Sequence, residues 1–421
     1  MKPVHLIPLV LSLCLWACGG DNKPTATDGG EDSVESSNSN AKAVDYSLGR
    51  AMNNRLGKGI NLGNAWDGAA YWTCGTLKDA FDQGDSAYIP LVAADTSDYV
   101  NMPFKRYNYG CRDRLDSSWS NPISDDYFKF LKDAGFNSIR LPVRWQHNSN
   151  PETHEVNPDR LAGVKQDVKL AIDAGLAVVI SFHWYIELMY AGNHATTLPD
   201  YYAEEKAHFA ALWKQIATEF KDFPDTMLVW DILNEPTFKD VNILNEVMNT
   251  GYEAIRSVDK NKTIMFESYH AAKFADITAL QLPEDGNIIY SGHYYEPYNY
   301  SHQGHNYGCK GDDAYAMTAY NDFKAYADSA RKMYPDKNGG FIPLNMGEFG
   351  VSGGKSNPCG SKGPSDKYRA IWTRDLIKAV AKYDISWHYW GFVGVGGFEA
   401  YDKSSGNWYP GMLEAFGLTG E

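Results

Sequence analysis

The chain has 421 residues, of which 43% are hydrophobic and 14% aromatic, and a formal net charge of −14 at pH 7. This amount of apolar material is enough to build a substantial core. The negative charge argues against nucleic acid or an anionic membrane surface as the main partner, because both would repel the protein, whereas a neutral partner is compatible. The twelve tryptophans indicate either a large aromatic core or aromatic surfaces on which a ligand stacks.

The N-terminal stretch has the pattern of an export signal. Lys2 precedes an apolar run over 4–15, which is too short and wrongly flanked for a transmembrane helix. The run ends in a sequence that resembles a bacterial lipobox, which predicts lipidation of Cys18; ordinary cleavage nearby is the alternative, because Trp16 is unusual in such a box. We expect a signal peptide over 1–17 and an exported protein, either a cell-envelope lipoprotein or a secreted one.

Two further segments follow this signal. Residues 18–43 consist almost entirely of small, polar and charged residues, which cannot bury enough apolar surface to offset their ordering entropy, so we expect a flexible linker. From residue 44 to the C-terminus at 421 a single pattern persists, in which short β-branched runs alternate with helical stretches. This pattern predicts one folded domain over 44–421.

The candidate strands of this domain are short, and several are almost continuously hydrophobic. Residues 177–180, for example, read Ala-Val-Val-Ile, which suits a parallel strand buried on both faces. Between the strands, apolar residues recur at helical spacing, as over 201–222 and 368–379. The eight candidate strands span 59–63, 136–143, 176–183, 227–233, 263–268, 287–293, 341–346 and 385–390.

Two of the predicted helices end alike. Lys-Asp-Ala-Gly leads into the strand at 136 and Ile-Asp-Ala-Gly into the strand at 176, where Gly135 and Gly175 can adopt the left-handed conformation that ends a helix. Eight strands alternating with helices predict an α/β fold, a (β/α)8 TIM barrel, with a long insertion over 67–120 after the first strand. A doubly wound sheet is the alternative, but the glycines of 59–64 lack the spacing of a phosphate-binding loop.

In such a barrel, functional side chains lie at the carboxyl ends of the strands. Glu235 follows the fourth candidate strand and Glu348 the seventh, so we expect the two carboxyl groups to face each other across the barrel mouth. Opposed carboxyl groups are what glycoside hydrolysis requires, since one protonates the leaving oxygen while the other attacks or activates water. A separation of about 5–5.5 Å gives retention of configuration, and a wider gap gives inversion.

Several motifs occur in order at the ends of the predicted strands, namely Asn234-Glu235-Pro236, Gly347-Glu348-Phe349-Gly350, Arg140, His183 and His293-x-Tyr295. This ordered set resembles glycoside hydrolase family 5, the former cellulase family A, from about residue 59 to 390. The segments 59–64 and 136–145 are similar to the endoglucanase and xyloglucanase branches of that family. The resemblance implies a (β/α)8 catalytic domain that hydrolyses a β-linked polysaccharide by double displacement, with Glu235 as general acid/base and Glu348 as nucleophile.

The resemblance also implies roles for the residues around the two glutamates. Asn234 would hold the sugar 2-hydroxyl, while Arg140 and Tyr295 would keep Glu348 ionised and aimed. His293 would neighbour Glu235 and assist its change between acid and base. His183 and Trp390 would line the subsite of the reacting sugar, with Trp390 as its apolar platform.

Substrate preference is less firmly indicated than the chemistry. Many family members have a second histidine after the strand-three histidine, where this chain has Trp184. Asn64 and Asp67 follow the first strand, where relatives often keep sugar-binding groups. We expect an endo-acting β-1,4-glucanase, with xyloglucan, mixed-linkage glucan (lichenan) and mannan as alternative substrates.

Two other interpretations stay open. His183 and His293 are candidate metal ligands, as in barrel hydrolases that bind metal through strand-end histidines, although the first strand lacks a His-x-His pair. A non-catalytic lipoprotein that holds polysaccharide is the second alternative, although a pure binder has no need of Glu235, Glu348 and their supporting residues. His302 and His305 lie in predicted loops and are expected at the surface. The sequence indicates no cofactor and no metal, and we expect a monomer.

Four cysteines remain once Cys14 in the signal and Cys18, the predicted lipidation site, are set aside, and an even number in an exported chain favours disulfides. Three connectivities are possible. Pairing Cys74 with Cys111 and Cys309 with Cys359 is preferred because each pair would close one long loop. A zinc site is the rival, but no two cysteines have the close spacing of zinc ligands.

Overall fold

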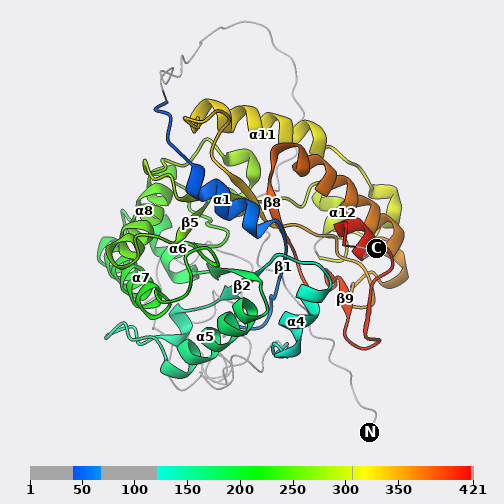
Figure 1. Cartoon of the computed structure of the whole chain (residues 1–421), viewed down its shortest axis with the longest axis horizontal. Helices are drawn as coiled ribbons and strands as arrows, with labels where there is room; N and C mark the ends of the chain where they lie inside the picture. Colours follow the sequence, from blue (N-terminus) through cyan, green and yellow to red (C-terminus); the bar gives the residue numbers. More distant parts are fainter. Residues whose placement is uncertain (1–40, 68–120, 306, 419–421) are drawn as a thin grey trace, which may run out of the picture.

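The structure is a computed structural model that describes residues 41–67, 121–305 and 307–418. Within these ranges eight parallel strands form a closed barrel, in which the last strand pairs with the first (Figure 1). The strands are β1 Lys58–Asn61, β2 Ser138–Val143, β3 Ala177–Phe182, β4 Leu228–Asp231, β5 Thr263–Glu267, β6 Ile288–His293, β7 Leu344–Glu348 and β8 Ser386–Tyr389. All eight predicted strands are confirmed, and the doubly wound alternative is wrong.

Helices surround the barrel (Figure 1). The longer ones are α4 Asp126–Asp133, α5 Pro158–Asp173, α7 Pro199–Glu219, α8 Val241–Val258, α11 Ala319–Met333 and α12 Asp366–Val380. Shorter ones are α6 Ile186–Asn193, α9 Tyr269–Ala272, α10 Tyr298–Ser301 and α13 Met412–Phe416, and a small hairpin pairs β9 Tyr401–Asp402 with β10 Asn407–Trp408. Only α9 and one 3₁₀ turn, Phe274–Asp276, lie between β5 and β6.

The alternation of side chains along each strand separates two environments. In β3, Val178 and Ile180 belong to the large core between barrel and helices, whereas Val179 packs inside the barrel and Ser181 hydrogen-bonds there to Arg140. This period of two is the ordinary geometry of a strand. It brings Arg140, Ser181, Asp231 and Glu267, all fully buried, into the interior near the carboxyl ends of β2 to β5.

The opposite end of the barrel is closed by α1 Ser47–Leu56, which runs almost directly into β1. Met52 and Leu56 of α1 join an apolar cluster with interior strand residues that include Val179, Val229 and Met265. Each buried side chain of this size contributes roughly 1.5–3 kcal/mol through the hydrophobic effect. The apolar floor formed by α1 therefore supports the polar layer above it.

Local signals in the sequence are confirmed with small shifts. Gly135 and Gly175 follow α4 and α5 with φ values of 101° and 86°, as the helix endings predict. The seventh strand begins at Leu344 rather than at residue 341 and continues to Glu348, since Pro343 has no N–H to donate to the ladder. The predicted signal peptide, almost all of the linker and almost all of the insertion lie outside the described residues. Within the described ranges no helix is both long and apolar enough to cross a membrane.

Candidate active site

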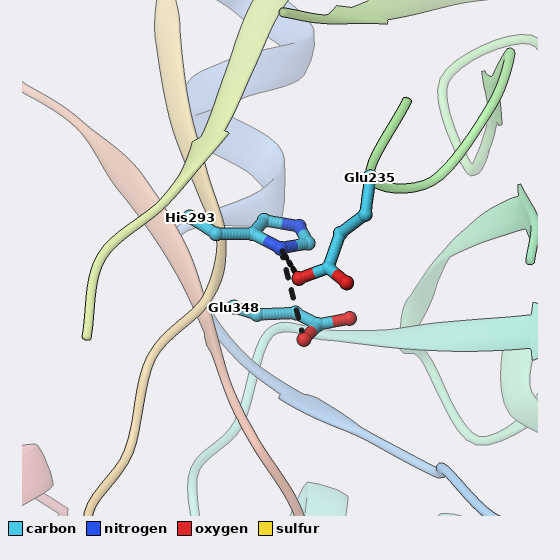
Figure 2. A group of neighbouring side chains, drawn as sticks. All are labelled: Glu235, His293 and Glu348. Atoms are coloured by element: carbon cyan, nitrogen blue, oxygen red, sulfur yellow. Dashed lines mark hydrogen bonds and ion pairs between the residues drawn. The ribbon is translucent and has the colours of Figure 1, made fainter. Parts of the chain in front are cut away.

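Two glutamates converge at the carboxyl end of the barrel. Glu348 is the last residue of β7, and Glu235 lies in the turn that follows β4. One carboxylate oxygen of each glutamate and a ring nitrogen of His293 all lie within 4.8 Å of one another, and Figure 2 shows the three side chains pointing toward a common centre. The structure thus brings together the pair of carboxyl groups that the strand positions predict.

Glu348 is held by two donors. Nη1 of Arg140 donates to Oε1 at 2.8 Å, and the hydroxyl of Tyr295 donates to Oε2 at 3.0 Å. Burial raises the pKa of Glu348 to about 7, against the opposing effect of the His293 and Arg140 charges. Both hydrogen bonds favour the ionised form, because they place positive charge or a donor against the carboxylate. They also fix the direction of the carboxylate.

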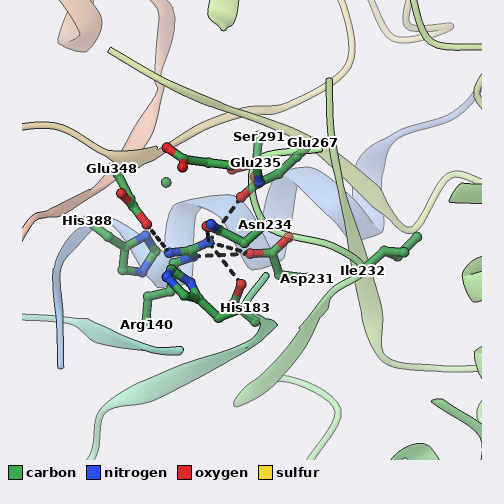
Figure 3. A network of polar contacts seen from close by, with 12 residues as sticks. Arg140, His183, Asp231, Ile232, Asn234, Glu235, Glu267, Ser291, Glu348 and His388 are labelled. Atoms are coloured by element: carbon green, nitrogen blue, oxygen red, sulfur yellow. Dashed lines mark hydrogen bonds and ion pairs between the residues drawn. The ribbon is translucent and has the colours of Figure 1, made fainter. Parts of the chain in front are cut away.

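Arg140 is the centre of a buried polar network (Figure 3). Its Nη2 donates to Oδ2 of Asp231 at 2.9 Å, to Oδ1 of Asn234 at 2.6 Å and to Oε1 of Glu267 at 3.1 Å. Burial on its own would lower the pKa of Arg140, but the surrounding carboxylates raise it above the ordinary value. A permanently charged guanidinium therefore links strands β2, β4, β5 and β7.

Glu235 has an unusual backbone conformation. Its φ is 48°, a left-handed value that is costly for a residue with a side chain, and its backbone N–H donates to Oε2 of Glu267 at 2.8 Å. Its side chain is 11% exposed. Oε1 lies 3.0 Å from Nδ1 of His293, and Oε2 accepts a long hydrogen bond of 3.4 Å from the indole N–H of Trp184. Glu235 is thus held through its backbone by Glu267 and through its side chain by His293 and Trp184.

His293 lies between carboxylates. Its Nδ1 is 3.0 Å from Oε1 of Glu235 and 3.7 Å from Oε2 of Glu348, while its Nε2 is 3.2 Å from Oε1 of Glu267. Burial would lower the pKa of His293, but the negative charges of Glu267 and Glu348 and the hydrogen bond to Glu235 raise it well above the usual value. The ring is therefore favoured as a cation at neutral pH.

His183 and Trp390 lie parallel beside the glutamates, with ring centroids 5.8 Å apart and an interplanar angle of 1°. Burial and the charge of Arg140 hold the pKa of His183 well below its usual range, so the ring is neutral. In the part of the chain that the structure describes, Nδ1 of His183 and Nδ2 of Asn234 are buried without a hydrogen-bond partner. Buried polar atoms of this kind are available to sugar hydroxyls, since leaving them unpaired is unfavourable.

The side chains of Asn64 and Asp67 form hydrogen bonds with backbone groups of loop segments. The amide of Asn64 donates to the carbonyl of Gly394 at 2.9 Å, and Oδ1 of Asp67 accepts the backbone N–H of Ala65 at 2.9 Å. Asp67 is also 3.6 Å from Nε2 of His183, and burial raises its pKa. Contact of either residue with sugar remains a prediction.

Two buried acids in the network were not assigned a role from the sequence. Glu267 is the last residue of β5 and Asp231 the last residue of β4, although in the sequence the apolar run around Asp231 continues to Leu233. The signal for Glu267 is its position at the end of a strand, where polar residues of such a barrel carry function. Asp231 was hidden because a sequence does not tell which face of a strand points into the barrel.

The expectation of surface positions for His302 and His305 is wrong. Both rings are buried, with exposed fractions of 7% and 8%, and both pack against Phe398 at centroid distances of 5.1 and 5.5 Å. Burial lowers the pKa of His302 to about 3. Loop segments are usually exposed, but here the segment after β6 is covered by the segments that follow β7 and β8.

The same loops contain a disulfide between Cys309 and Cys359, which is the preferred pairing for these two cysteines. Near it, the amide of Asn357 donates to the carbonyl of Gln303 at 3.1 Å, so the segments after β6 and β7 are joined by covalent and polar contacts. The predicted pair Cys74 and Cys111, and the predicted lipidation site Cys18, lie outside the described residues.

A metal ion fits this site poorly. Within the described ranges, the only cluster of three candidate ligands is Glu235, His293 and Glu348, and His183 is not part of it. Arg140 already donates to Glu348, and a cationic His293 has no lone pair to offer. A divalent ion would have to displace both positive groups, which the four carboxylates around them stabilise.

A comparison with protein families gives a match over residues 99–394 to the model described as Cellulase (glycosyl hydrolase family 5). The match covers well over half of the chain. The chain belongs to glycosyl hydrolase family 5. This membership agrees with the closed barrel and makes the protein a glycoside hydrolase.

Several relatives of this family 5 protein are identical to it at 25–28% of the aligned positions. Endoglucanase 1 of Ruminococcus albus is 28% identical over an alignment of 312 residues that covers 68% of this chain and 69% of the relative. Xyloglucan-specific endo-beta-1,4-glucanase BoGH5A of Bacteroides ovatus is 25% identical over an alignment of 260 residues that covers 56% of this chain and 50% of the relative. Among solved structures, Cel5A of Thermotoga maritima in complex with cellobiose has a TM-score of 0.65 and 26% identity, and the match covers 87% of this chain and 99% of that one.

Proposed function

We propose that this family 5 protein is a retaining endo-β-1,4-glucanase in which Glu235 is the general acid/base and Glu348 the nucleophile. The observation that carries the proposal is the approach of their carboxylate oxygens to within 4.8 Å. Retaining enzymes separate the two carboxyl groups by about 5–5.5 Å, whereas inverting enzymes need about 6.5–9.5 Å to admit a water molecule between sugar and base. The short distance favours direct attack by a carboxylate.

The surroundings of each glutamate suit its proposed role. In the first step Glu235 gives its proton to the glycosidic oxygen, the bond from that oxygen to the anomeric carbon breaks, and an oxygen of Glu348 bonds to that carbon. In the second step Glu235 takes a proton from water, the water oxygen bonds to the carbon, and Glu348 leaves as a carboxylate. Arg140 and Tyr295, which donate to Glu348, stabilise the negative charge that develops on Glu348 as it leaves the sugar in this step.

The subsite of the reacting sugar is proposed at Asn234, His183 and Trp390. Oδ1 of Asn234 accepts from Arg140, which leaves its Nδ2 as a donor for the sugar 2-hydroxyl. A hydrogen bond to this hydroxyl gains strength as positive charge develops on the ring. The flat face of Trp390 beside His183 offers a stacking surface for the sugar.

The proposal that the substrate is a β-1,4-glucan rests on the names of similar proteins. Three endoglucanases of Ruminococcus albus match this chain, BoGH5A is described as specific for xyloglucan, and Cel5A of Thermotoga maritima has been solved with cellobiose and with mannotriose. Product release from carboxymethyl cellulose, xyloglucan, lichenan, mannan and xylan decides among these substrates. The proposal predicts the highest turnover on carboxymethyl cellulose or lichenan, and turnover confined to mannan or xylan would contradict it.

The proposed mechanism has a direct test. A 2-deoxy-2-fluoro-β-cellobioside with a dinitrophenolate leaving group should trap the glycosyl-enzyme, and peptide mass spectrometry should find the label on Glu348. Proton NMR of the first-formed product should show the β-anomer. Glu235→Ala and Glu348→Ala should each abolish turnover of cello-oligosaccharides while the fold is kept. An inverted product, or a label on another residue, would refute double displacement.

We also propose that the protein is exported, with a signal peptide over 1–17, a linker over 18–43 and a catalytic domain over 44–421. The Cys309–Cys359 disulfide supports this, because disulfides persist in oxidising compartments. Mass spectrometry of the mature protein isolated from its source tests the prediction. A lipid-modified N-terminus at Cys18 supports the lipoprotein form, an unmodified N-terminus nearby supports the secreted form, and retention of 1–17 contradicts both.

A further inference from the structure

Glu267 makes three hydrogen bonds at the edge of the proposed site although it is completely buried. Its Oε2 accepts the backbone N–H of Glu235 at 2.8 Å, and its Oε1 lies 3.1 Å from Nη2 of Arg140 and 3.2 Å from Nε2 of His293. It is the last residue of β5, so its position is fixed by the barrel itself. Burial raises the pKa of Glu267, but the charges of His293 and Arg140 and the Glu235 N–H lower it overall.

These contacts determine which nitrogen of His293 carries a permanent proton. An ionised carboxylate only accepts hydrogen bonds, so Nε2 of His293 must be protonated to bond with Glu267. The other nitrogen, Nδ1, faces Oε1 of Glu235 at 3.0 Å. Because the ring is favoured as a cation, Nδ1–H donates to Oε1 of Glu235 whether Glu235 is ionised or carries its acid proton on Oε2. In both states of Glu235, Nε2 keeps its proton.

We propose that Glu267 is a positioning residue that fixes the Nε2–H form of His293 and the backbone of Glu235, so that Glu235 can act as acid and as base in turn. The inference rests on the proposed function of Glu235. The three side chains form a chain in which a carboxylate orients an imidazole and the imidazole serves the reacting group, the logic of a catalytic triad.

The chain Glu267–His293–Glu235 suits both halves of the double displacement. When Glu235 has given its proton to the leaving group, Nδ1–H of His293 stabilises the carboxylate that remains. When Glu235 regains a proton from water, the imidazole accommodates the acid form without rotating, because its other nitrogen stays bonded to Glu267. The other charged or titratable groups around the ring are Glu348, 3.7 Å from Nδ1, Arg140, which shares Oε1 of Glu267 with the ring, and His183, whose pKa the charge of His293 lowers.

Another buried acid of the protein, Asp231, serves as a comparison for the role of Glu267. Asp231 is as deeply buried as Glu267 and also pairs with Arg140, at 3.1 Å from Nε and 2.9 Å from Nη2. No hydrogen bond between Asp231 and His293 occurs among the described contacts. If Glu267 only balanced the charge of Arg140, Asp231 would be its equivalent. The contacts to His293 and to the Glu235 backbone are what distinguish it.

The test compares Glu267→Gln with Asp231→Asn on two substrates. Cellotetraose has a poor leaving group that needs an acid, whereas 2,4-dinitrophenyl β-cellobioside has one that leaves without protonation. Glu267→Gln should lower kcat/KM on cellotetraose by about 10- to 100-fold, within the range that general acid–base catalysis supplies. It should lower kcat/KM on the dinitrophenyl substrate much less, and azide, a nucleophile that needs no base, should raise its kcat on that substrate. Asp231→Asn should affect both substrates equally and should not respond to azide.

Equal losses on the two substrates for Glu267→Gln, without an azide response, would overturn the inference. A second measurement needs no substitution of Glu267. Nitrogen-15 NMR of the wild-type imidazoles, with the His293 signals identified by their absence in His293→Gln, should show Nε2 protonated across the active pH range. A proton on Nδ1 with a bare Nε2 would overturn the inference even if Glu267→Gln does not fold.

Failure of the proposed function has a different signature. Glu235→Ala should itself lose far more on cellotetraose than on the dinitrophenyl substrate and should respond to azide. If it does neither, Glu235 is not the acid/base and the proposed function fails. The nitrogen spectrum of His293 is independent of any substrate, so a wrong form of the ring refutes only the role of Glu267.

Discussion

The hydroxyl of Tyr295 donates a hydrogen bond of 3.0 Å to Oε2 of Glu348. Attack on the sugar needs the ionised form of Glu348, whose pKa burial raises to about 7, so kcat/KM should fall as the pH drops below that value. Tyr295→Phe removes a donor that favours the carboxylate, which raises the pKa further and moves the acid limb of the pH profile to higher pH. We expect kcat/KM at neutral pH to fall about 10- to 150-fold, the effect of a charge-assisted bond.

The neighbouring tyrosine provides the control for this prediction. The hydroxyl of Tyr294 donates to Oδ2 of Asp322 at 2.6 Å, away from Glu348. Tyr294→Phe makes the same chemical change one residue earlier and should leave the acid limb in place. A pH profile of Tyr295→Phe that coincides with that of Tyr294→Phe would show that the Tyr295 hydroxyl does not act on Glu348.

Asp231 should make the stability of the fold depend on pH. Burial and the nearby Glu267 raise the pKa of Asp231 to about 7, whereas a free aspartate titrates at about 3.9. Between these values the folded state binds more protons than the unfolded state. The contribution of Asp231 to stability is therefore complete at low pH and is lost as the pH rises toward about 7. Because Asp231→Asn does not titrate, its Tm should vary less than that of the wild type between about pH 4 and about pH 7.

Thermal unfolding followed by circular dichroism across this range measures the effect. The quantity to compare is the Tm of Asp231→Asn minus the Tm of the wild type, and this difference should increase as the pH rises. A difference that stays constant would mean that Asp231 remains ionised throughout and that Arg140 outweighs the burial of the carboxyl group.

Gly63 leaves room for the indole of Trp390. A Cβ at this position would lie 2.4 Å from the indole ring, far too close for van der Waals contact, so the rigid ring would have to move as a whole. Gly63→Ala should therefore displace Trp390 and raise KM for cello-oligosaccharides, by up to about 10-fold if one stacking contact is lost. Gly308→Ala is the matched control, since its Cβ would have nothing within 4 Å. Equal KM values for the two variants would show that Trp390 does not support the sugar.

Trp184 connects the strand-three turn to Glu235. The backbone of Trp184 has a left-handed φ of 54°, and the amide of Gln146 donates to its carbonyl at 2.5 Å, which holds the turn in place. The indole N–H of Trp184 donates to Oε2 of Glu235 at 3.4 Å. Trp184→Phe keeps a ring but removes the donor. Because the bond is long, we expect only about a 2- to 5-fold loss of kcat/KM on cello-oligosaccharides. Trp408→Phe, in the hairpin beside Phe130, is the control and should have no effect on activity.

Much of the fold could be predicted because its signals are local. Gly135 and Gly175 mark helix ends through a conformation that favours glycine, and β-branched runs mark the strands. The closure of the floor by α1 could not be predicted, since Met52 and Leu56 form an ordinary amphipathic pattern whose partners come from β3, β4, β5 and β6. The partners of a helix depend on tertiary packing, which a local pattern does not contain.

The candidate site, like the fold, was predictable from the sequence only in part. Glu235 and Glu348 were predictable because both follow apolar runs at the ends of strands and match an ordered set of motifs. The contact of Arg140 with Glu348 was predicted from the same motifs, but its sharing with Asp231 and Glu267 was not, because no sequence spacing links these two acids to it. His302 and His305 were misjudged because their burial depends on loops that follow other strands.

Both ends of the described chain lie at the floor of the barrel. α1 closes that end, and Nζ of Lys58, at the start of β1, donates to the carbonyl of Gly417 at 2.7 Å, just after α13. The two glutamates lie at the opposite ends of the strands. A tether at either end of the described chain, to a bead, a scaffold or another domain, would therefore hold the barrel by its base and leave the end with the two glutamates facing away from the attachment point.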